Sequence, residues 1–292
     1  MIPAEVMQKI RRIQIRTSHM VNDILAGAYH SVFKGQGMEF EEVREYVPGD
    51  DIRLIDWNVT ARTSVPHIKI LVEERELTVM LLVDASGSGR FGSVGRFKNE
   101  LAAELCAVLA FSAIRNHDKV GLIIFTDDVE LFVPPGKGRR HVLRVIREVL
   151  YFKPKGRGTD IPEALHYMNG VVKRRAVAFV VSDFMADGYE TPLRIANKRH
   201  DVIAVTVTDP REEFLPDVGL VHVRDAETGG QTLIDTGDGS VRKKYAKAAA
   251  QRAASREEIF RRTRVDAIHV RTDRDYIDEI FRFFRMRERR FA

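Results

Sequence analysis

Three short segments place hydroxyl and carboxylate side chains where a predicted strand meets a loop. They are Asp84-Ala-Ser86-Gly-Ser88, Gly156-Arg-Gly-Thr159-Asp160 and Ser182-Asp183-Phe184. In an open α/β sheet, functional groups gather at the carboxyl ends of the strands, so we expect these segments to meet. Their oxygens are hard ligands that suit Mg²⁺ or Mn²⁺, whereas zinc prefers His or Cys, which the segments lack. The candidate metal ligands are Asp84, Ser86, Ser88, Thr159 and Asp183.

The elements that must position these residues follow an alternating pattern from Leu77 onward. Short apolar runs alternate with longer amphipathic ones, which predicts β-α-β units, a mostly parallel sheet and helices on both faces. The predicted strands are Leu77–Asp84, Val120–Phe125, Ala176–Ser182, Asp201–Val207 and Val265–His269. The predicted helices are 97–115, 138–152, 160–173, 188–199, 240–262 and 275–288. Turn residues between two short apolar segments predict a β-hairpin at about 220–235.

Residues 1–76 depart from this rhythm. They begin with a helical stretch to about Ala26 and continue with a Gly-rich, charged and strand-like segment. We therefore expect an N-terminal extension, residues 1–76, packed on a main domain formed by residues 77–292. Within the extension, the alternating charges from Arg44 to Arg62 favour a salt-bridge network. The alternative is a docking surface anchored by Trp57, although we expect this single tryptophan to be partly buried.

Each of the three chemical segments also has a simpler structural interpretation. Asp-x-Ser-x-Ser by itself is compatible with a turn that ends a strand and caps a helix. Thr159, which stands just before Ile-Pro-Glu, is compatible with a helix N-cap. Asp183 could cap the next helix or simply end a strand. The order of the three segments along the chain, each at a predicted strand end or loop, favours the metal site over these alternatives.

Asp84, Ser86 and Ser88 match the Asp-x-Ser-x-Ser motif of the metal-ion-dependent adhesion site in von Willebrand factor A-like domains. Thr159 and Asp183 fall where the other members of that site are expected. The resemblance implies that the serine hydroxyls touch the metal, that the threonine reaches it directly or through water, and that the aspartates act through water. It further implies an open coordination position that accepts a carboxylate from a partner protein.

A second resemblance covers nearly the whole chain. The segment from Gly35 to Arg62, which includes Glu-Tyr-Val-Pro-Gly-Asp-Asp-Ile-Arg and Asp56-Trp57, resembles the signature of the domain of unknown function number fifty-eight. Ser182-Asp183-Phe184, Asp209-Pro-Arg-Glu and Asp225-Ala-Glu227-Thr-Gly resemble that family as well. The chain departs from it at Gly89, where members often carry Met, and a glycine-rich insertion follows.

The second resemblance implies both a fold and a partner. The fold is α/β, a von Willebrand A-like doubly wound sheet with an N-terminal helical and β extension and a hairpin insertion. The family is typically encoded beside MoxR-type AAA+ ATPases, which implies a non-enzymatic, Mg²⁺-dependent adaptor that links such an ATPase to client proteins during maturation. A metal-dependent phosphoester hydrolase is the alternative, but hydrolases with a strand-end aspartate nucleophile need a second acid where this chain has Ser86.

Composition limits the other classes of function. The 47 Lys and Arg nearly balance the 42 Asp and Glu, which argues against a nucleic-acid binder. The aromatic and basic segment after Phe281 is compatible with nucleic-acid stacking, but its spacing favours an amphipathic helix that packs Ile280, Phe283 and Phe284. A single cysteine, Cys106, excludes an intrachain disulfide and fits a cytoplasmic location as a core residue. No apolar run is long enough for membrane insertion, and the N-terminus lacks the apolar core of a signal peptide.

Overall fold

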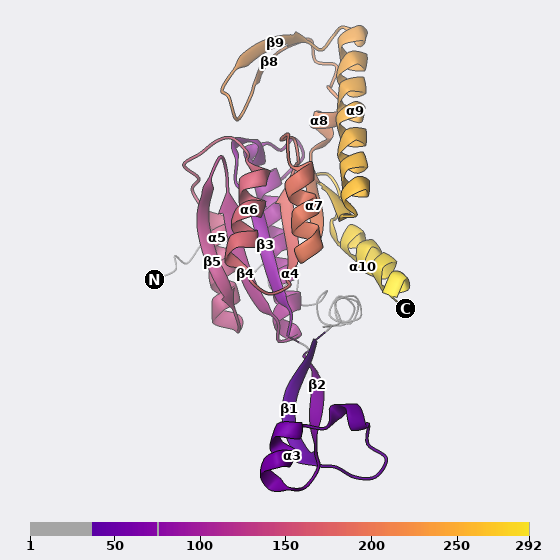
Figure 1. The fold of residues 1–292 in the computed structure, drawn as a ribbon. Coiled ribbons are helices and arrows are strands. Elements are labelled where there is room, and N and C mark those ends of the chain that lie inside the picture. The colour runs from indigo at the N-terminus through magenta and orange to yellow at the C-terminus, as the bar shows by residue number, and fades with distance from the viewer. Residues whose placement is uncertain (1–36, 75, 292) are drawn as a thin grey trace. The chain divides into compact units, whose positions relative to one another are not determined.

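A computed structural model describes residues 37–74 and 76–291 of the chain (Figure 1). The chain divides into two units, and the boundary that leads into the larger one lies between Leu77 and Thr78. This boundary is adjacent to the predicted division between residues 76 and 77. The predicted helix that ends near Ala26 lies outside the described residues, and packing of residues 1–76 on the main domain stays a prediction.

The larger unit is built on a six-stranded sheet with the order β10-β7-β6-β3-β4-β5. Its strands are β3 (Thr78–Asp84), β4 (Lys119–Phe125), β5 (Val129–Gly136), β6 (Val177–Ser182), β7 (Asp201–Thr208) and β10 (Asp266–Arg271). All neighbours pair in parallel except β5, which lies antiparallel to β4 at one edge. Strand order reverses at β3, so the sheet is doubly wound and ligands are expected beside the end of this strand. The predicted fold class is confirmed, whereas β5 was not predicted.

Helices cover both faces of the sheet. They are α4 (Lys98–Arg115), α5 (Arg139–Tyr151), α6 (Ile161–Val171), α7 (Glu190–Arg199), α8 (Pro210–Glu213), α9 (Gly239–Thr263) and α10 (Ile277–Phe291). Met80 and Leu82 of β3 pack in one cluster with α6 and α7. Successive strand side chains point to opposite faces, so Leu81 faces the other side, where α4 packs on β3. Every position from Val79 to Val83 is buried, as predicted for a strand covered on both faces.

The smaller unit contains an antiparallel pair of strands, β1 (Gly37–Glu45) and β2 (His67–Glu74). A 3-10 helix (Ile52–Leu54) and α3 (Trp57–Thr63) connect them. Arg44 donates two hydrogen bonds of 2.8 Å to the carboxylate of Asp50, which is one ion pair of the predicted salt-bridge network. The expected partial burial of Trp57 is wrong: its side chain is 70% exposed, because α3 buries none of its residues.

Two further elements complete the larger unit. The predicted hairpin is confirmed as β8 (Leu220–Arg224) paired with β9 (Gln231–Asp235). The C-terminal helix α10 buries its apolar stripe as predicted, and it also buries Arg287, which pairs with Asp201 at 2.7 Å. Cys106 is buried in α4 as expected. Across the described ranges, no helix combines the length and apolarity that crossing a membrane would require.

Candidate metal centre

The segment after β3 turns its polar side chains toward one another. The Oδ1 of Asp84 accepts a hydrogen bond from the backbone N–H of Ser86 at 2.9 Å. The hydroxyls of Ser86 and Ser88 lie 3.1 Å apart. Ser86 precedes the 3-10 helix η3 (Gly87–Arg90), but its side chain makes no capping bond there. The alternative interpretation, a turn that ends a strand and caps a helix, therefore accounts for the hydrogen bond of Asp84 to the backbone. It does not account for the two serine hydroxyls, which remain candidate ligands.

Thr159 faces this segment from the loop before α6. Its Oγ1 lies 3.4 Å from Oδ2 of Asp84. The helix cap is supplied by the next residue, Asp160, whose carboxylate accepts from the N–H of Glu163 at 2.8 Å. The interpretation of Thr159 as an N-cap is therefore wrong, and its hydroxyl is directed toward the centre.

Two acids that the sequence did not single out hold the loop that carries Thr159. Asp127 accepts hydrogen bonds of 3.1 Å from the N–H groups of Arg157 and Gly158. Glu130 accepts from the N–H groups of Lys155 and Gly156. A Cβ at Gly158 would lie 2.0 Å from Oδ1 of Asp127, so only glycine allows this close approach. Because β5 was not predicted, the sequence offered no reason to place Asp127 or Glu130 beside Thr159.

Asp183 lies just after the end of β6, next to Ser182, which also contacts the centre. Ser182 donates a hydrogen bond of 2.6 Å to Oδ2 of Asp84, which fixes that carboxylate from the neighbouring strand. Phe184, which follows Asp183, has a left-handed backbone with φ of 54°, which is unfavourable for a bulky side chain. Its ring is held in edge contacts with Tyr189 and Phe260. Asp183 does not cap α7, whose N-cap is Tyr189.

A buried lysine compensates one of the two aspartates. The ammonium of Lys98 lies 2.7 Å from Oδ2 of Asp183 and 2.5 Å from Oε1 of Glu212, and its side chain is only 3% exposed. Burial alone would raise the pKa of Asp183, but the charge and hydrogen bond of Lys98 hold it below the ordinary value. Burial likewise opposes the charge on Lys98, yet Asp183 and Glu212 raise its pKa. Sequence reasoning missed Lys98 because a lysine in a first helical turn normally faces solvent.

Among the residues that the structure describes, no cation pairs with the other aspartate, Asp84. Burial, reinforced by the charge of Asp183, raises the pKa of Asp84 to about 6. A cavity of about 20 Å³, enough for one water-sized particle, is lined by Asp84, Ser88, Ser182, Asp183 and Lys98, among others. An uncompensated carboxylate beside hydroxyl oxygens fits a hard divalent cation. Within the described residues, no three His, Cys, Asp or Glu side chains form a metal-binding group, so such an ion would depend on hydroxyl ligands.

A third carboxylate reaches the centre from the β8–β9 hairpin. Oε1 of Glu227 accepts a hydrogen bond of 3.0 Å from Oγ1 of Thr159. Burial raises the pKa of Glu227 above its ordinary value. The structure therefore brings the five predicted residues together and adds Glu227. The sequence placed this residue in the family signature without giving it a role.

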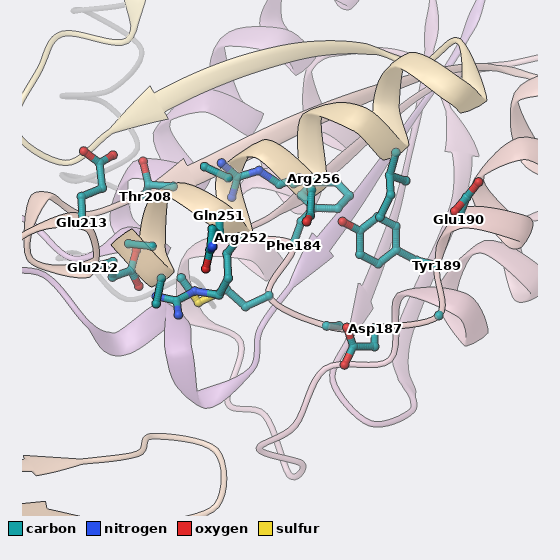
Figure 2. A pocket seen from close by; sticks show the side chains of 18 of the residues that line it. Phe184, Asp187, Tyr189, Glu190, Thr208, Glu212, Glu213, Gln251, Arg252 and Arg256 are labelled. Atoms are coloured by element: carbon teal, nitrogen blue, oxygen red, sulfur yellow. The ribbon is translucent and has the colours of Figure 1, made fainter. Parts of the chain in front are cut away.

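A larger pocket adjoins the centre on the side of α8 and α9. It has a volume of about 670 Å³, and Figure 2 shows its lining of acidic and basic side chains around Phe184 and Tyr189. Glu212, which pairs with Lys98, is part of this lining. Arg256 donates a hydrogen bond of 3.0 Å to the backbone carbonyl of Asp183. Glu212 and Arg256, which line the pocket, thus connect it to the metal centre through Lys98 and Asp183.

Comparison with known proteins identifies relatives. The family model described as "Protein of unknown function DUF58" matches residues 42–255. The uncharacterized protein Mb1516 of Mycobacterium bovis is 34% identical over 283 residues, which cover 96% of this chain and 89% of that protein. An aerotolerance-related membrane protein from Bacteroides fragilis is 17% identical with a TM-score of 0.48, over 73% of this chain and 99% of that one.

The SpRpn10 VWA domain is 12% identical with a TM-score of 0.37, over 70% of this chain and 93% of that chain. At such identities and scores, neither structural likeness bears on activity. The family match covers most of the chain, and the M. bovis relative aligns over nearly its whole length. The chain belongs to the DUF58 family.

Proposed function

We propose that this protein is a non-enzymatic, Mg²⁺-dependent adaptor whose metal centre captures a carboxylate of a partner protein. The observation that carries the proposal is the meeting of hydroxyls at the partly buried carboxylate of Asp84. The Thr159 hydroxyl and the Ser86 N–H contact this carboxylate, and the hydroxyls of Ser86 and Ser88 lie 3.1 Å from each other in the same loop. Neutral hydroxyl ligands leave a bound Mg²⁺ with most of its charge uncompensated, so it attracts a further anionic oxygen. Mn²⁺ would serve equally well in this ligand set.

Ligand chemistry favours binding over hydrolysis. Ser86 occupies the position where an aspartate-dependent phosphotransferase would place its acid, and a hydroxyl there is a poor proton donor at neutral pH. Asp84 itself is engaged by Ser182 and by the Ser86 N–H, which suits an orienting role better than nucleophilic attack.

The partner in this proposal is a MoxR-type AAA+ ATPase, and the adaptor links it to client proteins during their maturation. The proposal rests on the family signature together with the carboxylate-seeking metal centre. It places the protein in the cytoplasm, where the ATPase finds its nucleotide and where a single buried Cys106 stays reduced. Binding to nucleic acid has no part in this role.

A pull-down with the MoxR-type ATPase in Mg²⁺ buffer tests the proposal. We expect retention that EDTA abolishes, that excess Mg²⁺ restores and that Asp84→Ala reduces at least tenfold, because the variant loses the carboxylate that organises the centre. Glu163→Gln is the matched control, since Glu163 is exposed on α6. Binding that is indifferent to both EDTA and Asp84→Ala would refute the metal-bridged adaptor.

A further inference from the structure

We propose that Glu227 is a metal ligand supplied by this chain itself, so that the β8–β9 hairpin occupies the coordination position that a partner's carboxylate must take. The inference rests on the proposed function and deepens it. It turns the centre into a switch with two states, one closed by Glu227 and one open to a carboxylate from another protein.

The turn of the hairpin is built to aim Glu227 inward. Asp225 accepts hydrogen bonds from the N–H groups of Glu227 and Thr228, at 2.9 and 3.2 Å, which folds the turn tightly. Asp225, Ala226 and Thr228 are exposed, whereas Glu227 is partly buried. Its carboxylate accepts a hydrogen bond from Thr159, which is one of the three candidate hydroxyl ligands. An ion held by these hydroxyls would therefore lie within reach of Glu227.

The backbone of the turn also rests on the metal loop. A Cβ at Gly87 would lie 2.3 Å from the carbonyl oxygen of Ala226, a distance that no pair of such atoms tolerates. Gly87 stands between Ser86 and Ser88, so the hairpin contacts the segment that supplies the two serine hydroxyls. Figure 1 shows the hairpin extending over the end of the sheet where the parallel strands terminate. Its position is set by backbone packing as well as by one side-chain hydrogen bond.

Little else holds the hairpin down. No side chain of β8 or β9 is fully buried, and Leu220 and Leu233 are 67% and 55% exposed. An element with so few buried apolar contacts opens at low free-energy cost. The base of the hairpin is fixed separately to α9, because Arg242 donates hydrogen bonds to the backbone carbonyls of Thr236 and Gly237, at 2.5 and 2.9 Å. The tip can therefore leave the centre while the base stays in place.

The charge balance favours a cation beside Glu227 and the hydroxyls. Burial and then the charge of Asp183 raise the pKa of both Asp84 and Glu227, although in the described residues the three carboxylates do not form a metal-binding group by themselves. In the described part of the chain, one ion pair involves these three carboxylates, and it joins Asp183 to Lys98. With Glu212, which also contacts Lys98, four carboxylates share one ammonium, and a divalent ion would offset the remaining negative charge.

The two states imply a requirement on the partner. An intramolecular carboxylate acts at a high effective concentration, so a partner's carboxylate alone competes poorly with Glu227. A successful partner must gain free energy elsewhere, and the apolar side chains Val223 and Leu233, already exposed on the hairpin, offer it further contact. Glu227 thereby favours partners that engage both the metal and the hairpin.

Mn²⁺ binding measured by electron paramagnetic resonance tests the inference without a partner. We expect Glu227→Ala to weaken Mn²⁺ binding on the order of tenfold. Sodium acetate, compared with sodium chloride at equal ionic strength, should restore most of that affinity by filling the vacated position. Wild type and the control Glu163→Ala should not respond to acetate, because Glu227 already fills the position. Unchanged Mn²⁺ affinity in Glu227→Ala, or a loss that acetate does not repair, would overturn the inference.

Limited trypsin digestion provides a second readout. Mg²⁺ should slow cleavage after Arg224 in wild type but not in Glu227→Ala, whereas cleavage after the exposed Lys173 should be independent of Mg²⁺. Gly87→Ala keeps every ligand yet displaces the turn, so it should also lose the protection at Arg224. Equal protection at Arg224 in all three proteins would overturn the inference.

The same titrations separate the two hypotheses. If wild type binds Mn²⁺ and Asp84→Ala abolishes that binding, but Glu227→Ala leaves it unchanged, the inference fails and the proposed function stands. If wild type shows no Mn²⁺ binding that depends on Asp84, the proposed metal-dependent function fails, and the role of Glu227 fails with it.

Discussion

Lys98→Met is expected to lower the free energy of unfolding of the metal-free protein by about 3–5 kcal/mol. The methionine fills a similar volume but removes the ammonium that Asp183 and Glu212 share. Both carboxylates then remain at a buried position without a cation, and the cost of that arrangement exceeds the worth of most single contacts. Urea unfolding followed by circular dichroism measures the change.

Mg²⁺ should repair part of this loss. A divalent ion beside Asp183 supplies positive charge that Lys98→Met lacks, so Mg²⁺ should raise the melting temperature of the variant more than that of wild type. Lys155→Met is the control, because Lys155 is exposed in the same unit and its replacement should change the unfolding free energy by less than about 0.5 kcal/mol. A Lys98→Met protein as stable as wild type would show that the ion pairs contribute nothing to stability.

Asp84→Asn is expected to have the opposite effect: it should stabilise the metal-free protein at neutral pH while removing its response to Mg²⁺. The substituted asparagine keeps the shape of the side chain, and the hydroxyl of Ser182 can reorient to accept from its amide. The gain comes from avoiding a charged carboxylate in a largely buried place, and we expect about 1–2 kcal/mol after allowing for partial exposure. Calorimetric melting with and without Mg²⁺ measures both effects.

The pH dependence of this gain follows from the direction of the shift. Because burial and Asp183 raise the pKa of Asp84 to about 6, the folded protein binds a proton more readily than the unfolded chain. The contribution of Asp84 to stability therefore falls as pH rises from about 4 to about 6 and stays unfavourable above that range. The advantage of Asp84→Asn should vanish toward pH 4. Asp128→Asn, an exposed site in the β4–β5 turn, should show no gain, and an equal gain there would contradict the explanation.

The candidate site could be predicted to the extent that its residues belong to strand ends. Apolar runs such as Val79 to Val83 fix where a buried parallel strand stops, and parallel strands stop at the same edge of the sheet. Asp84 and Asp183 were therefore expected at the same edge, and the pairing of β3 with β6 in the structure makes them neighbours. The edge strand β5 was not predicted, because Pro134 and Pro135 interrupt its pattern. For the same reason, Asp127 and Glu130, which hold the Thr159 loop, were not predicted to lie near the site.

The sequence by itself determined the α/β fold, the order of the main elements and the five hydroxyl and carboxylate residues that meet at the sheet edge. Only the tertiary structure decided how their charges are balanced. Lys98 meets Asp183 across 85 residues and Glu212 across 114, and Glu227 meets Thr159 across 68. Local periodicity and capping rules act over a few residues, whereas these pairings depend on how β6, α8 and the hairpin pack around β3. The ammonium that neutralises the centre and the carboxylate proposed to close it are therefore consequences of packing.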